Sequence, residues 1–122
     1  MKGFCPGSEL NLDIQLTSNC DKFALNLEGR DVIAFHFNPR LNPGVVVRNS
    51  YDSEGWGDEE RDGVFPFQPH YSYGVHIMCT EKELITTITS KHRFIYSFAH
   101  RIPPRLITTF KAFGDLSVSK IR

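Results

Sequence analysis

The sequence has no excess of charge of either sign: 14 lysines and arginines face 14 aspartates and glutamates, so the formal net charge is +0. Nucleic acids and anionic membranes select basic surfaces, so neither is expected as the main partner. The chain also has no apolar run long enough to cross a bilayer, and residues 1–6 lack the apolar core of a signal peptide. We therefore expect a cytoplasmic protein without membrane insertion.

Cysteine is scarce too. Cys5, Cys20 and Cys79 are odd in number, and their spacings fit no zinc or redox motif. We expect three reduced thiols, with an intermolecular disulfide or an oxidation-sensitive thiol as open alternatives. Four histidines are scattered over separate segments and form no set of metal ligands: His70, His76, His92 and His100. We expect neither a metal nor a cofactor.

Helical periodicity is the third absence, because no window shows a sustained helical pattern capped at both ends. Residues 10–16 instead alternate strictly between apolar and polar, as a half-buried strand does. Further runs rich in Ile, Val, Thr, Phe and Tyr span 23–27, 32–40, 45–50, 73–80, 84–89, 93–99, 106–113 and 116–121. Turns are expected at 28–31 and 41–44. The pattern predicts one all-β domain over residues 1–122, an antiparallel sandwich or barrel.

The densest group of polar side chains lies between residues 36 and 61. Because side chains alternate along a strand, His36, Asn38 and Arg40 should share one face, while the apolar residues between them point into the core. If Arg40 pairs with Val45 across the turn, Asn49 falls opposite His36 and joins the same face. A slip of one residue would turn Asn49 away.

Trp56 lies between two glycines in a polar segment, where nothing nearby in the sequence would bury it. Glu59 and Arg61 follow two residues apart, so an extended backbone points both to one side. A carboxylate between Arg40 and Arg61 would form a charge-assisted lattice that holds the donors rigid.

This mixture of groups suits the binding of a sugar. An indole face favours the weakly positive C–H hydrogens on one face of galactose, and amides, guanidiniums and a carboxylate can satisfy its hydroxyls. Paired carboxylates could instead indicate a glycosidase. However, arginines beside Glu59 favour its ionised form and make it a poor acid. We expect binding and no enzymatic activity.

Three ordered motifs resemble the galectin signature H-x-N-P-R, V-x-N and W-x-x-E-x-R, at residues 36–40, 47–49 and 56–61. The similarity continues through 6–8, 63–69, 98–103 and 114–118, so it covers nearly the whole chain. The resemblance implies a β-sandwich of two antiparallel sheets with the jelly-roll topology of galectins and legume lectins. It also implies metal-independent binding of β-galactosides such as lactose and N-acetyllactosamine.

The resemblance also assigns a role to each matched residue. The galactose 4-hydroxyl would contact His36, Asn38 and Arg40; the 6-hydroxyl would contact Asn49 and Glu59; Trp56 would lie under the ring; and Arg61 with Glu59 would reach the next sugar. The implied partners are glycoproteins and glycolipids, and the implied location is the cytosol with unconventional secretion.

Two further expectations concern how the protein acts. A symmetric homodimer is compatible with the sequence and would supply avidity. The alternative function is a galectin-fold module for protein–protein interaction with weak or altered sugar binding. The feature that separates the two is the stretch between Arg40 and Asn49, which is shorter than in many family members. Lys91-His92 also stands where many members have Asn-Gly.

Overall fold

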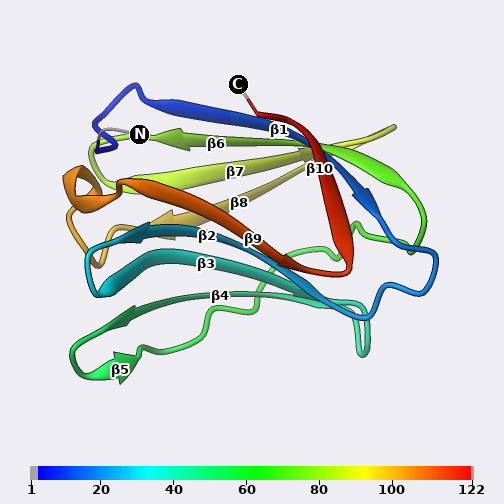
Figure 1. Ribbon diagram of the computed structural model, residues 1–122, viewed down its shortest axis with the longest axis horizontal. Coiled ribbons are helices and arrows are strands. Elements are labelled where there is room, and N and C mark those ends of the chain that lie inside the picture. The colour runs from blue at the N-terminus through cyan, green and yellow to red at the C-terminus, as the bar shows by residue number, and fades with distance from the viewer. Residues whose placement is uncertain (1–2, 122) are drawn as a thin grey trace.

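The computed structural model describes residues 3–121, which form ten strands in two antiparallel sheets of five (Figure 1). The back sheet contains, in spatial order, β10 (Leu116–Ile121), β1 (Glu9–Leu16), β6 (Ser72–Cys79), β7 (Glu83–Thr89) and β8 (Arg93–Ala99). The site sheet contains β5 (Gly55–Trp56), β4 (Val45–Asp52), β3 (Val32–Arg40), β2 (Phe23–Gly29) and β9 (Thr109–Gly114). The expected all-β sandwich is confirmed. Met1, Lys2 and Arg122, which the expected domain of residues 1–122 includes, lie outside the described residues.

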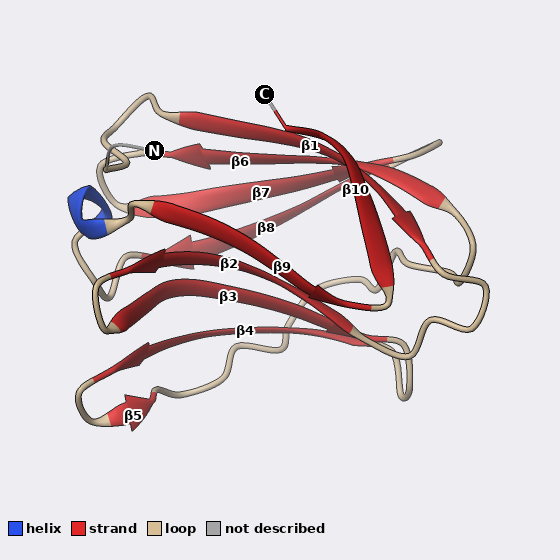
Figure 2. Cartoon of the chain, viewed as in Figure 1, coloured by secondary structure: helices blue, strands red, loops and turns tan. Residues whose placement is uncertain are grey.

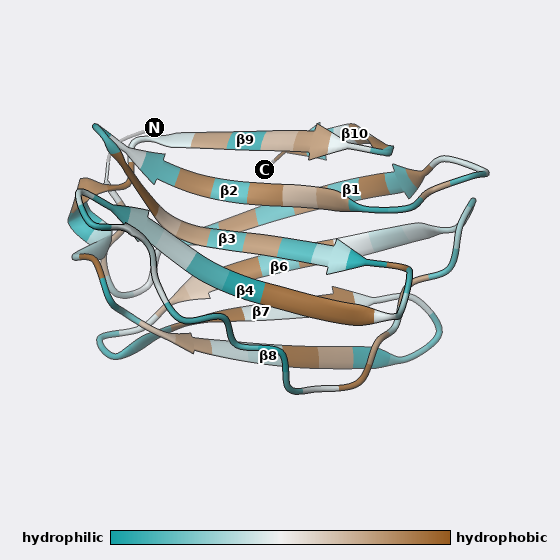
Figure 3. Cartoon of the chain, turned by 90° about the horizontal axis from the view of Figure 1, so that it is seen from below, coloured by the Kyte–Doolittle hydropathy of each residue, from teal (hydrophilic) through white to brown (hydrophobic). Residues whose placement is uncertain are grey.

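The chain crosses between the sheets after β1, after β5, after β8 and after β9. Each sheet turns one apolar face inward, and the two faces enclose a single core rich in Leu, Ile and Phe. The alternation that produces these faces is visible as changing colour along β2 and β3 (Figure 3). Burial of this apolar surface is the main stabilising contribution to such a sandwich.

The cysteines contribute to this packing as single thiols. All three are free, with Cys20 and Cys79 buried and Cys5 exposed. Burial, followed by the nearby carboxylates of Asp115 and Asp21, raises the pKa of the Cys20 thiol to about 11. Cys20 therefore behaves as a small apolar side chain at neutral pH.

Two expected boundaries are wrong. The turn predicted at 28–31 contains only residues 30 and 31, because β2 continues to Gly29, which pairs with Val32. Asp31 takes the left-handed conformation (φ 60°) that closes the hairpin. The strand predicted at 106–113 begins later, at Thr109. Pro104–Leu106 form a 3-10 turn instead, since a proline fits the first turn of a helix but lacks a donor for a sheet.

That turn, η1 (Pro104–Leu106), is the one helical element of residues 3–121, and strands account for the rest of the regular structure (Figure 2). In the same span of the chain, no helix has the length and apolarity needed to cross a membrane.

Candidate functional site

The β3–β4 hairpin places the predicted polar row as expected. Arg40 pairs with Val45, Asn38 with Val47 and His36 with Asn49. Side chains opposite one another across an antiparallel pair share a face, so Asn49 joins the row from the neighbouring strand. The intervening Phe35 and Phe37 are buried in the core on the other side of β3, at 1% and 0% exposure.

Within the row, each side chain orients the next. Asn38 donates from Nδ2 to the carbonyl of Phe23 at 2.7 Å, which fixes its amide and leaves Oδ1 facing Arg40. Arg40 donates to that oxygen from Nε at 3.0 Å. Two of the arginine's nitrogens remain, and Nη2 lies 3.6 Å from a carboxylate oxygen of Glu59. The guanidinium is therefore held from two sides, by Asn38 and by Glu59.

His36 is oriented by Asn26, which lies opposite it on the neighbouring strand β2. The Asn26 amide nitrogen donates to Glu28 at 3.0 Å, so its oxygen accepts from Nδ1 of His36 at 2.7 Å. Glu28 in turn pairs with Lys111 of β9 at 3.2 Å. This chain of contacts fixes the proton of the imidazole on Nδ1. Nε2 is left as an acceptor for an incoming hydroxyl.

The imidazole is also kept neutral. Burial, and after it the nearby Arg40 guanidinium, hold the pKa of His36 below its ordinary value of 6.5. A neutral ring accepts one hydrogen bond at the free nitrogen, whereas a protonated ring would only donate. At neutral pH the row therefore combines one acceptor from His36 with donors from Arg40.

Trp56 lies at the edge of the site sheet, and its surroundings differ from the sequence-based expectation. The predicted strand 45–50 continues to Asp52, and Trp56 pairs back onto Tyr51 as part of β5. Its ring centroid lies 4.8 Å from that of His36 and 5.3 Å from that of Tyr51, so it does have neighbours. Even so, 52% of Trp56 remains exposed. The indole is thus positioned by packing while one face stays open to a ligand.

Glu59 forms the expected carboxylate centre of an arginine lattice. Arg61 binds its Oε1 from both Nε and Nη2, each at 2.8 Å, and Arg40 approaches Oε2 from the other side. All three side chains are partly exposed, so the lattice contributes little to stability. Its effect is geometric, because a carboxylate shared by two guanidiniums holds both in fixed orientation.

An open hollow lies between these groups, with a volume of about 350 Å³, the lower end of small-ligand sites at roughly 300–1,000 Å³. The hollow is lined by His36, Arg40, Val47, Asn49, Trp56, Gly57 and Glu59. A second hollow of about 450 Å³ adjoins it across His36 and Arg40, and Asn38 lines that one. Arg61 lines neither and lies at the rim through its contact with Glu59. The structure therefore brings all seven predicted residues into one region.

Two residues of the site escaped the sequence analysis. Asn26 follows the alternation of residues 23–27, so its face could have been predicted, but its contact with His36 needs the β2–β3 register. Arg101 is the second. It follows β8 of the back sheet, yet its guanidinium reaches Asn49 on β4 at 2.9 Å. No local pattern in the sequence indicates a contact across 52 positions.

The described residues, 3–121, contain no group of three or more His, Cys, Asp or Glu side chains arranged to hold a metal ion. Apart from the Trp56 indole, the polar groups of the seven predicted residues are instead amides, guanidiniums, one imidazole and one carboxylate. Such a set recognises hydroxyl groups through directed hydrogen bonds.

Comparison with known proteins gives consistent similarities. A family model described as galactoside-binding lectin matches residues 1–122. A 32 kDa beta-galactoside-binding lectin of Caenorhabditis elegans is 38% identical over 90 residues, which cover 74% of this chain and 32% of that protein. Galectin-1 of Capra hircus is 34% identical over 119 residues, covering 93% of this chain and 86% of that protein. The crystal structure of the Caenorhabditis elegans galectin LEC-6 has 30% identity and a TM-score of 0.85, covering 99% of this chain and 84% of that chain.

The lengths of these relatives differ. The chain spans about a third of the nematode lectin but most of the goat protein.

Proposed function

The chain belongs to the galactoside-binding lectin family, the galectins, and from this we propose that it binds β-galactosides such as lactose and N-acetyllactosamine without a metal ion or other cofactor. The structural observation that supports this function most directly is the pairing of a half-exposed indole with a row of pre-oriented hydrogen-bonding groups. Trp56 supplies the apolar surface, and His36 with Arg40 supplies an acceptor and donors beside it.

The proposed contacts follow from what each group has left to offer. Nε2 of His36 accepts from the axial 4-hydroxyl, and Arg40 with Asn38 completes the contacts of that oxygen. Asn49 uses one amide hydrogen on the Gly57 carbonyl at 2.9 Å, so its second hydrogen is free for the 6-hydroxyl, with Glu59 as the acceptor. Rigid groups of this kind discriminate between epimers, since a misplaced hydroxyl leaves a desolvated partner unpaired.

Beyond the galactose, the Glu59 and Arg61 pair at the rim is proposed to contact the next sugar. The same lattice makes catalysis a poor fit. A glycosidase needs a carboxyl group that can donate a proton beside the glycosidic bond, whereas the Glu59 carboxylate is engaged by two guanidiniums. We therefore propose binding without hydrolysis.

We propose further that the protein cross-links glycans of glycoproteins or glycolipids by self-association. An open site of this kind gives a short sugar an affinity between roughly micromolar and millimolar. Linked sites on one assembly raise the effective affinity for clustered ligands without any new contact.

Binding is tested by titrating the protein with lactose and following the emission of Trp56, the single tryptophan of the chain. Lactose should change the emission without added calcium, while sucrose should not. Trp56→Ala and Arg40→Ala should each abolish retention on immobilised lactose while the far-UV spectrum stays that of a β-sandwich. Retention of either variant would remove the assigned site. Failure of the unaltered protein to bind any galactoside, together with capture of a specific protein, would favour the interaction module.

A further inference from the structure

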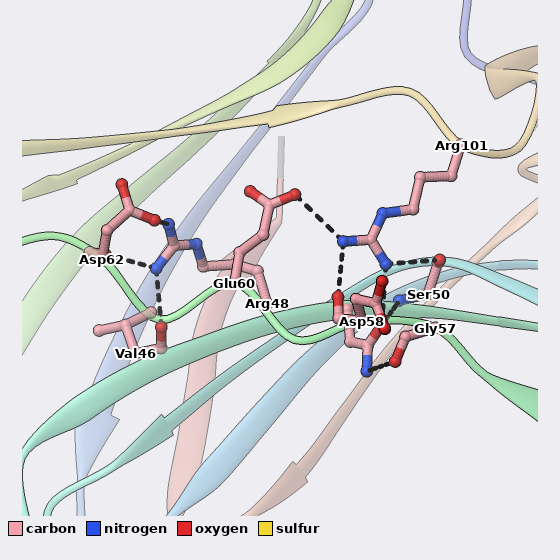
Figure 4. Close-up of polar contacts among 9 residues, drawn as sticks. Val46, Arg48, Ser50, Gly57, Asp58, Glu60, Asp62 and Arg101 are labelled. Atoms are coloured by element: carbon pink, nitrogen blue, oxygen red, sulfur yellow. Dashed lines mark hydrogen bonds and ion pairs between the residues drawn. The ribbon is translucent and has the colours of Figure 1, made fainter.

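Arg101 connects the two sheets at the site. It belongs to the segment after β8 of the back sheet, where its guanidinium lies 4.7 Å from the ring centroid of Phe98. From there its Nη1 donates to Asn49 Oδ1 at 2.9 Å and to Ser50 Oγ at 3.3 Å. Its Nη2 donates to the Asp58 carbonyl at 2.7 Å and to Glu60 at 3.1 Å. Figure 4 shows the Arg101 guanidinium directed at Ser50, Asp58 and Glu60.

The loop needs such a partner because it carries an extra residue. Trp56 pairs with Tyr51, and Glu60 forms a bridge with Arg48, so four steps along the loop face three along β4. This mismatch is a β-bulge, which interrupts the ladder and leaves backbone groups without strand partners. The Asp58 carbonyl lies inside the bulge, and Arg101 supplies its donor. The arginine therefore takes the place of a missing ladder hydrogen bond.

The packing at Gly57 independently supports a role for Arg101 in placing this loop, because the Arg101 guanidinium lies close against Gly57. A Cβ at Gly57 would come within 2.8 Å of Arg101 Nη1 and 3.2 Å of Asn49 Oδ1. Gly57 has no left-handed φ to explain its identity. An alanine at position 57 would therefore displace the guanidinium from its present place, so the glycine and the arginine fit together by close packing.

Arg101 acts on the ligand site through its neighbours. Asn49 and Gly57 line the hollow beside Trp56, whereas Arg101 lines a different hollow, which shares only Trp56 and Gly57 with the first. The contact with Arg101 and the backbone N–H of Ser50 together occupy Oδ1 of Asn49. That arrangement fixes the amide with Nδ2 toward the hollow.

From these contacts we propose that Arg101 is a positioning residue for sugar binding. It fixes the amide of Asn49 and the path of the loop that carries Trp56, and it does so without touching the sugar. The role rests on the proposed function of the site. Arginine suits it better than lysine, because a planar fork can reach several acceptors in different directions, whereas an ammonium is a compact point charge.

The test compares Arg101→Met, Arg101→Lys and Gly57→Ala with Arg105→Met, a control that removes an exposed arginine a few residues along the same segment. Affinity for lactose is measured by calorimetry, and the accessibility of Trp56 by acrylamide quenching. Arg101→Met and Gly57→Ala should weaken lactose binding about tenfold or more, which corresponds to about 1.4 kcal/mol of binding free energy per tenfold. Both substitutions should also increase the quenching of Trp56. Arg101→Lys should recover part of the affinity, and the control should match the unaltered protein.

Two further measurements distinguish a positioning role of Arg101 in sugar binding from a purely structural role. Because the effect passes through Asn49, Arg101→Met should cost less affinity in an Asn49→Ala background than in the unaltered protein. It should also weaken lactose more than the lactose analogue that lacks the galactose 6-hydroxyl. Additive losses, equal losses for both sugars, or affinity within about twofold of the unaltered protein would overturn the proposal.

The two proposals fail in distinguishable ways. If the unaltered protein binds no galactoside, the proposed function fails. Trp56 quenching and amide hydrogen exchange at residues 57–60 then decide the positioning role. Faster exchange and greater quenching in Arg101→Met, absent in Arg105→Met, would support it, and unchanged values would overturn it.

Discussion

At the scale of single residues, His36 determines how recognition depends on pH. Its Nδ1 is committed to Asn26, and burial and Arg40 lower the pKa of the ring from 6.5. Protonation at Nε2 would replace the acceptor by a donor and add a positive charge beside Arg40. We expect lactose affinity to be flat near neutrality and to fall as the pH drops below 6.5 toward the lowered pKa. Calorimetric titrations from pH 7.5 to 5 would measure this.

The same shift affects stability in the same direction. The unfolded chain takes up a proton on His36 at higher pH than the folded protein does, so the contribution of His36 to stability is present above pH 6.5 and is lost as the pH falls through the lowered pKa.

The control for the pH dependence of lactose binding is His92→Gln, which alters an exposed histidine and should leave the pH profile of binding unchanged. An unchanged profile in His36→Gln would contradict the assignment.

Residue positions on the site face were largely predictable. Alternation along residues 32–40 and one hairpin register were enough to place His36, Asn38, Arg40 and Asn49 together, and the register is as expected. Asn26 and Arg101 were not predictable, because their contacts depend on which strands become neighbours and on how a loop from the other sheet approaches.

At the scale of elements, Arg48 of β4 holds the segment after β5 in place. Arg48 is only 2% exposed. Its Nη1 donates to the carbonyls of Val46 and Asp62, at 2.8 and 2.6 Å (Figure 4). Its guanidinium also lies 5.3 Å from the Tyr96 ring centroid. The ion pair with the Asp62 carboxylate is short, at 2.6 Å, but that side chain is 87% exposed, so solvent screens the attraction. The backbone contacts should dominate.

Arg48→Met should therefore lower the free energy of unfolding by about 2–4 kcal/mol, because a buried carbonyl and a partly buried one both lose their donor. Asp62→Asn, which removes the carboxylate and keeps the backbone carbonyl, should cost less than about 1 kcal/mol. Urea denaturation of both variants gives the comparison. Equal losses would show that the ion pair, and not the backbone contacts, fixes this segment.

The limits of the predicted elements have physical causes. Strands with clear alternation were placed within a residue or two, as in β1 and β8. β5 was missed, since two residues are too few to show alternation, and its pairing depends on β4 continuing beyond Ser50. The start of β9 was wrong because apolar residues after Pro104 resemble a strand in composition, while the prolines impose a helical turn.

At the scale of the whole molecule, valency is the property on which the proposed cross-linking depends. Sedimentation velocity should give a mass about twice the 14.0 kDa of the chain. Binding to a surface dense in lactose should be far tighter than binding to free lactose, and it should weaken on dilution below the dimer dissociation constant. A single 14.0 kDa species that still agglutinates lactose-coated particles would contradict self-association as the source of valency.

Along β3, phenylalanine side chains point into the core and polar side chains point outward. This alternation constrains how the gene can change over evolutionary time. Substitutions alter one face at a time, so specificity can drift while Phe35 and Phe37 stay in place. Inserting or deleting one codon within residues 36–40, beyond the register shift that β3 already has between Ile33 and His36, would instead exchange the two faces and destroy core and binding surface together. Length variation should accumulate elsewhere, in exposed connections such as residues 53–54 and 90–92.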